Sequence, residues 1–142
     1  MQSEHLQNVR PTWIAFGWFL SAAATALALF ALIGTGLLHP DAQGTGAGWM
    51  VLCVGAGFFL GGYLTGARAG AAPILHAVGI GLFSLVAWFA LNLVLGSVTG
   101  AAEWRALPAS LTAGLLLLQM VAAAIGGRLG SRDARGGPHP AR

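Results

Sequence analysis

Few side chains in this sequence of 142 residues could do chemistry, and their positions restrict which chemistry is open. The only cysteine, Cys53, lies inside an apolar run, so an internal disulfide or a cluster of thiolate metal ligands is excluded. The carboxylates all lie in polar links or tails, at Glu4, Asp41, Glu103 and Asp133. Because the pattern contains no pair of nucleophile and base, no metal-ligand set and no carboxylate pair, we expect neither an enzyme nor a bound cofactor or metal.

Three polar side chains lie within apolar runs: His76, Asn92 and Gln119. In lipid such groups hydrogen-bond across helices, and each bond contributes about 0.6–2 kcal/mol. We therefore interpret all three first as polar contacts within the protein or between two copies of it. Asn92 and Gln119 are expected at depths that differ by about one helical turn. The alternative interpretation is that Asn92 and Gln119 line a path for a solute.

Glycines recur at intervals of four residues in two of the apolar runs. They are Gly57, Gly61, Gly62, Gly66, Gly126 and Gly130. Spacing by four places small residues on one face of a helix, where they allow a second helix to approach closely. A phosphate-binding glycine loop would need a lysine, and the sequence has none. We interpret the six glycines as helix-packing positions. In the first of the two runs, at residues 57, 61, 62 and 66, we expect alanine to be absorbed and leucine to force the helices apart.

Four apolar segments must position these groups, and each spans or nearly spans a hydrocarbon core about 30 Å thick. They cover residues 12–38, 48–65, 73–98 and 108–129. Only 8% of the residues are charged, whereas soluble domains average about 25%. Too few charges are therefore present to cover a water-facing exterior. Because a backbone in lipid must satisfy its own hydrogen bonds, the segments are predicted to be helices.

The predicted fold is an all-α, integral membrane four-helix bundle over residues 12–130. A short segment, residues 1–11, precedes the bundle. The tail, residues 131–142, is polar and rich in Gly and Pro, so it is expected to be disordered. Short links predict that helices adjacent in sequence are antiparallel neighbours in space.

The basic charges predict the orientation of this bundle, because cytoplasmic links carry an excess of them. All seven basic residues are arginines, and with the N-terminus inside six are cytoplasmic: Arg10, Arg68, Arg128, Arg132, Arg135 and Arg142. Both termini are thus predicted inside, in a multi-pass protein of a bacterial inner membrane. Tyr63 then marks the inner interface, and Arg68 lies in a turn where it reaches lipid headgroups. Because the arginines are scattered, nucleic-acid binding is not expected.

The two halves of the predicted bundle resemble each other. A shift of 62 residues aligns the start of the first segment with the start of the third, and a shift of 65 residues aligns the glycine pair 61–62 with the pair 126–127. The chain would then consist of two tandem two-helix hairpins, in parallel orientation in the membrane. Because a bias towards Ala, Gly and Leu also produces chance matches, duplication and chance are both open.

The stretch "GGYLTGARAG", followed by "LHAVGIGLF", resembles the central hairpin of a family of uncharacterised four-helix bacterial membrane proteins. The pattern of that family is Gly-Gly-Tyr-x-Ala-Gly, a basic residue, and then Leu-His-Gly. The matching positions are Gly61, Gly62, Tyr63, Gly66, Arg68, Gly70, Leu75 and His76. Ala77 stands where the family has glycine. The resemblance covers only this part of the chain, and it implies the four-helix architecture but no activity.

These patterns favour a non-enzymatic accessory or scaffold subunit that packs through its glycine faces with a second copy or with a larger membrane complex. Membrane lipids are the other expected partners. The alternative, from a different class, is a small oligomeric channel or transporter whose path is lined by Asn92 and Gln119.

Overall fold

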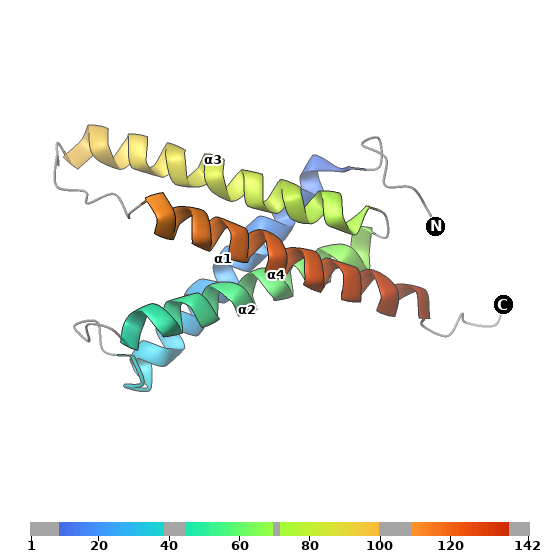
Figure 1. Cartoon of the computed structure of the whole chain (residues 1–142), viewed down its shortest axis with the longest axis horizontal. Helices are drawn as coiled ribbons and strands as arrows, with labels where there is room; N and C mark the ends of the chain where they lie inside the picture. The colour runs from blue at the N-terminus through green and yellow to red at the C-terminus, as the bar shows by residue number, and fades with distance from the viewer. Residues whose placement is uncertain (1–8, 39–44, 70–71, 100–108, 137–142) are drawn as a thin grey trace.

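The computed structural model describes residues 9–38, 45–69, 72–99 and 109–136, and within these ranges it contains four α-helices (Figure 1). They are α1 (Pro11–Gly34), α2 (Thr45–Ala69), α3 (Pro73–Thr99) and α4 (Ala109–Gly136). Each contains a stretch that is long and apolar enough to cross a membrane. The predicted all-helical fold with four membrane-length helices is therefore confirmed.

Large apolar side chains cover the outside of the bundle. On α1, Phe19, Leu27 and Phe30 are each about 70% exposed, whereas Ser21 and Thr25 of the same helix are buried. A helix of a water-soluble bundle has the opposite arrangement, with its apolar stripe on the core and its polar side chains outside. The arrangement on α1 is the one that a hydrocarbon solvent favours.

The first helix is shorter than its apolar run. It begins at Pro11, whose missing N–H costs nothing in the first turn, and it ends at Gly34. Gly36 then adopts a left-handed conformation, with φ of 75°, which turns the chain. Residues 35–38, which the hydropathy pattern assigned to the first span, are therefore not helical.

The fourth helix is longer than predicted, because it continues to Gly136. Residues 131–136 were expected in the disordered tail, but they form the last turns of α4. The Ser131 hydroxyl donates to the Arg128 carbonyl, and Asp133 accepts a hydrogen bond from Tyr63 of α2. The first bond is local to α4, whereas the second joins the polar end of α4 to α2. Residues 137–142 lie outside the described part of the chain.

The helices do not pack in simple sequence order. α2 packs most extensively against α4 and then α1, and α3 packs mainly against α4. Figure 1 shows α3 and α4 running side by side, with the α1–α2 pair crossing them. The short link between α2 and α3 makes them antiparallel, as expected, but these two helices contact each other least among the pairs in substantial contact.

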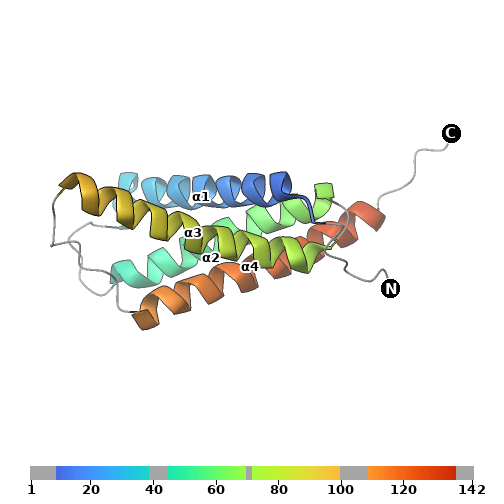
Figure 2. The same ribbon diagram turned by 90° about the horizontal axis from the view of Figure 1, so that it is seen from above.

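One end of the bundle carries the described arginines. α1 and α3 begin there and α2 and α4 end there, as Figure 2 shows on its right side. We call it the arginine-rich end, after Arg10, Arg68, Arg128, Arg132 and Arg135. Arg105, Arg142 and the other two links lie outside the described residues, so the orientation across a membrane stays a prediction.

The contacts between α2 and α4 are reciprocal. A Cβ added to Gly62 would meet Ala123, and one added to Gly126 would meet Phe59. Ala123 and Gly126 stand 64 residues after Phe59 and Gly62, so each contact is the image of the other. Gly66 with Gly127, and Gly130 with Tyr63, form a second such pair. The α2–α4 contacts are therefore related by an approximate twofold axis along the bundle, as expected for two tandem hairpins. Equivalent residues are 64 positions apart, one fewer than the shift of 65 that aligns the glycine pairs in the sequence.

Candidate functional site

One glycine face of α2 lies against α1. A Cβ at Gly57 would lie 2.8 Å from the Ser21 carbonyl oxygen, and one at Gly61 would lie 2.6 Å from the Gly17 carbonyl oxygen. Gly17, Ser21 and Thr25 recur every four residues, so α1 presents its own small-residue face to these glycines. The sequence already contained this signal, but the prediction was restricted to glycine pairs and did not include it.

A second glycine face of α2 lies against α4. A Cβ at Gly62 would lie 2.6 Å from the Ala123 Cα, and one at Gly66 would lie 2.6 Å from the Gly127 Cα. From α4, Gly126 and Gly130 meet the backbone of α2 at Phe59 and Tyr63. All six predicted helix-packing glycines are thus used inside the chain, and none of them is free to receive a partner.

The close approach changes the prediction for alanine. Real Cβ atoms essentially never come within 3.0 Å of another heavy atom, and the atoms that a Cβ at Gly62 or Gly66 would meet belong to the backbone of α4. A backbone cannot rotate away as a flexible side chain can. We therefore expect one methyl group to separate the helices at Gly62 and Gly66, in place of the sequence-based expectation that alanine is absorbed there.

His76 connects the start of α1 to the start of α3. Its side chain is only 2% exposed. Nε2 lies 3.4 Å from the backbone nitrogen of Arg10, which donates to it. Nδ1 lies 2.9 Å from the Ala72 carbonyl oxygen. Because Nε2 accepts, the network assigns the ring proton to Nδ1, which donates to Ala72. The predicted polar contact at His76 is thus an interhelical one.

Tyr63, which was predicted at the inner membrane interface, has a hydrogen-bond partner within the protein. Its hydroxyl donates to Asp133 of α4 over 2.8 Å, at the exposed surface of the arginine-rich end. This hydrogen bond joins two residues that are far apart in sequence, and the spacing pattern gave no signal for it. It adds a polar contact to the α2–α4 interface beside Gly130.

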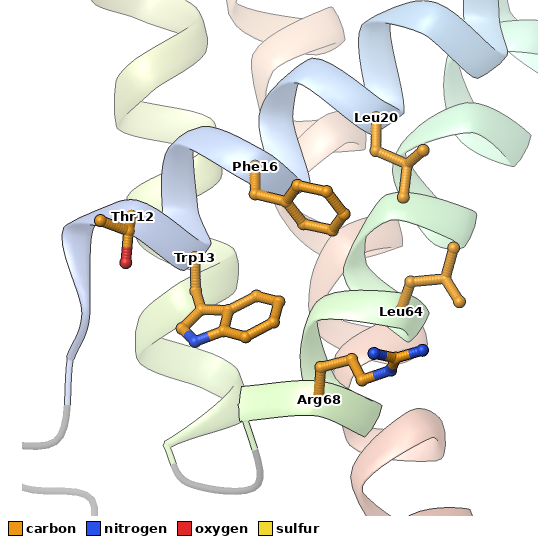
Figure 3. A pocket seen from close by; sticks show the side chains of 6 residues that line it. All are labelled: Thr12, Trp13, Phe16, Leu20, Leu64 and Arg68. Atoms are coloured by element: carbon orange, nitrogen blue, oxygen red, sulfur yellow. The ribbon is translucent and has the colours of Figure 1, made fainter.

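A pocket of about 680 Å³ opens between α1 and α2 at the arginine-rich end (Figure 3). We call it the α1–α2 pocket; its lining residues are Thr12, Trp13, Phe16, Leu20, Leu64 and Arg68. Arg68 supplies the charge, and the rest of the lining is mostly apolar. The Trp13 and Phe16 rings meet edge to face, with centroids 5.6 Å apart, so each limits the rotation of the other.

A smaller cavity of about 80 Å³ lies between α3 and α4. We call it the α3–α4 cavity; it is lined by Ser84, Trp88, Thr112, Leu115, Leu116 and Gln119. The Ser84 and Thr112 hydroxyls and the Gln119 carbonyl oxygen are buried there without a hydrogen-bond partner among the described residues. The volume suffices for about two water molecules.

These unpartnered hydroxyls differ from the other buried hydroxyls of the described helices. Ser21, Thr25 and Thr65 each donate to the carbonyl of the residue four positions earlier, over 2.7–2.8 Å. Such local bonds satisfy a hydroxyl without any ligand. Ser84 and Thr112 make no bond of this kind. The sequence indicated Ser and Thr hydroxyls only in general, as lining of the channel alternative, and did not single out Ser84 or Thr112.

The helix register does not bring Asn92 to Gln119. Gly81 of α3 lies against Met120, so Gln119 is level with Gly81. Asn92 stands eleven residues further along α3, which corresponds to about 16 Å along the helix axis. The Asn92 side chain lies outside the described part of the structure. Of the two predicted path-lining residues, only Gln119 is placed in a cavity.

The described residues contain no group of three or more His, Cys, Asp or Glu side chains that could hold a metal ion. Cys53 is buried as a free thiol at the α1–α2 interface, where its carbonyl oxygen lies 3.4 Å from the Thr25 hydroxyl. The chemistry that the described site residues offer is therefore hydrogen bonding, one cationic group and apolar contact.

Four helices of membrane length with large apolar side chains on their outer surface indicate a multi-pass membrane protein of the helical-bundle class. No protein-family model, no curated protein and no solved structure matches the chain.

Proposed function

We propose that the chain is a non-enzymatic accessory or scaffold subunit of a bacterial inner membrane, where it associates with a second copy or with a larger membrane complex. The observation that supports a structural role is that several buried polar side chains hydrogen-bond to the backbone of the protein itself. Ser21, Thr65 and His76 all bond to backbone groups of the protein itself. Groups committed to the fold in this way are not presented to a substrate.

The surface through which the subunit associates is the outward face of α1. Phe19, Leu27 and Phe30 fall within a narrow arc of the helix by their spacing and are each about 70% exposed. Because the glycine faces are occupied within the chain, a partner helix would contact these exposed side chains of α1. Aromatic side chains contribute large contact areas at helix interfaces.

Purification from native membranes in a mild detergent tests this proposal. We expect a stoichiometric partner or a discrete oligomer, which the double variant F19A/F30A loses while it keeps the wild-type unfolding curve. L117A, an outward change on α4 at a side chain that is 62% exposed, is the matched control and should leave the association intact. A monomer without a partner would contradict the proposal.

The same purified material tests the second candidate function, a small channel or transporter. The α3–α4 cavity favours this alternative, because it presents three unpartnered polar atoms between two membrane-length helices. Reconstituted vesicles that show solute flux, abolished by Q119M in a protein that still folds, would establish the channel and remove the scaffold proposal. Absence of flux together with a stoichiometric partner would support the scaffold subunit and remove the channel.

The proposed orientation places the arginine-rich end in the cytoplasm, since it carries the described arginines. In a Cys53→Ala background, single cysteines at Gly46 and at Arg135 should react oppositely with a membrane-impermeant thiol reagent in intact spheroplasts. Gly46 should react from outside, and Arg135 only after lysis. Equal labelling of both from outside would contradict the orientation.

A further inference from the structure

We propose that the α1–α2 pocket binds one anionic phospholipid, with the phosphate at the Arg68 guanidinium and an acyl chain along Phe16, Leu20 and Leu64. The pocket is amphipathic in the same way as such a lipid, with a charged group at one end and apolar side chains along its length. Arg68 stands in the last turn of α2, at the level where α1 begins, whereas Leu20 and Leu64 lie deeper in their helices (Figure 3). From Thr12 to Leu20 the pocket runs about 12 Å along α1.

The charge of the pocket selects the headgroup. A guanidinium forms bidentate hydrogen bonds with phosphate oxygens and is attracted to anionic headgroups at the membrane surface. The one carboxylate among the described residues, Asp133, accepts a hydrogen bond from Tyr63, and no ion pair joins it to Arg68 within the described part of the chain. A net negative lipid such as phosphatidylglycerol therefore complements the pocket better than the zwitterionic phosphatidylcholine.

The aromatic residues give the pocket a defined shape. Trp13 and Phe16 hold each other edge to face, and the hydrogen bond from the Arg10 backbone to His76 fixes the start of α1 that carries them. Tryptophan favours the headgroup level, because its ring is apolar and its N–H can donate to a polar group. A pocket of about 680 Å³ lies within the range of ligand sites in proteins.

The second hairpin provides a matched control. The shift of 64 residues that relates the α2 and α4 contacts places Arg132 at the position equivalent to Arg68. On α3, however, the residues 62 positions after Trp13 and Phe16 are Leu75 and Val78. Arg132 is thus an exposed arginine in the last turns of a helix at the same end, without the aromatic partners.

The test is lipid retention by the full chain. The protein is incubated in detergent with equal amounts of phosphatidylglycerol and phosphatidylcholine, and bound lipid is counted by native mass spectrometry. Wild type and R132Q should each retain one phosphatidylglycerol per chain in preference to phosphatidylcholine. R68Q should lose this preference by about tenfold or more, since it removes a charge-assisted contact. Leu64→Trp, which fills the pocket at an exposed position, should reduce retention of both lipids.

Three results would overturn the proposal. Equal retention of both lipids by wild type would mean an unspecific acyl contact only. An equal loss in R132Q and R68Q would mean that general surface charge attracts the lipid. Competition by inorganic phosphate as effective as that by phosphatidylglycerol would mean that the pocket recognises a free anion and not a lipid.

Discussion

Gly62→Ala is expected to destabilise the bundle by about 3 kcal/mol, the upper part of the range for overpacked interiors. The added methyl carbon would lie 2.6 Å from the Ala123 Cα and still closer to its carbonyl oxygen. Because both atoms belong to the α4 backbone, the two helices must move apart along their whole contact, and many small dispersion contacts are lost. The free energy of unfolding in detergent micelles, measured by denaturant titration with circular dichroism, reports the change.

The control for this variant is Gly114→Ala on α4. A Cβ at Gly114 has no heavy atom within 4 Å among the described residues, so the variant should be neutral or stabilising by up to about 1 kcal/mol, because alanine favours the helix. If the two substitutions changed stability equally, close helix approach at Gly62 would not be the reason for its glycine.

His76→Ala is expected to cost about 2–4 kcal/mol, from the cavity left by the ring and from the loss of its hydrogen bonds. The imidazole is buried, and without it the Arg10 N–H and the Ala72 carbonyl each lose a partner. The effect should also appear as earlier fraying at the start of α1, measured by faster hydrogen exchange of its first-turn amides.

Arg10→Ala distinguishes this contact from a charge effect. The hydrogen bond to His76 uses the backbone N–H of Arg10, not its guanidinium. Removing the exposed side chain should therefore leave stability nearly unchanged. A large loss in Arg10→Ala, with little change in His76→Ala, would contradict the assigned role of His76.

The sequence predicted the elements of this fold better than their ends and their pairing. Apolar runs of membrane length have one structural solution in lipid, so the four helices followed from hydropathy. Residues 131–136 were assigned to the tail because their local composition is polar, and the hydrogen bond between Tyr63 and Asp133 joins residues too far apart in sequence for that composition to indicate it. The link length between α2 and α3 suggested close neighbours, yet the glycine faces decided the packing and placed α2 against α4.

The candidate sites were predictable only in part, because their geometry depends on how the helices pair. Spacing by four located the glycines on helix faces, but it could not tell an internal interface from one between proteins. Arg68 was expected in a turn at a lipid surface, but it lies in the last helical turn of α2. The pocket that it lines depends on how α1 crosses α2 and brings Trp13 to the same pocket. Gln119 was singled out as a polar residue at depth, but its cavity partners Ser84 and Thr112 became apparent only once the α3–α4 register was known.

The pairing of α2 with α4 has a consequence for biosynthesis. A nascent chain leaves the ribosome from its N-terminus, so the α1–α2 hairpin enters the bilayer first. Its contact through Gly57 and Gly61 can form at once, but the opposite face at Gly62 and Gly66 has no partner until the last helix is inserted. Until α4 is inserted, the small-residue face of α2 at Gly62 and Gly66 is accessible to other helices in the membrane. We therefore expect chains that stop before α4 to be less stable than the complete bundle, because the face at Gly62 and Gly66 lacks its helix contacts.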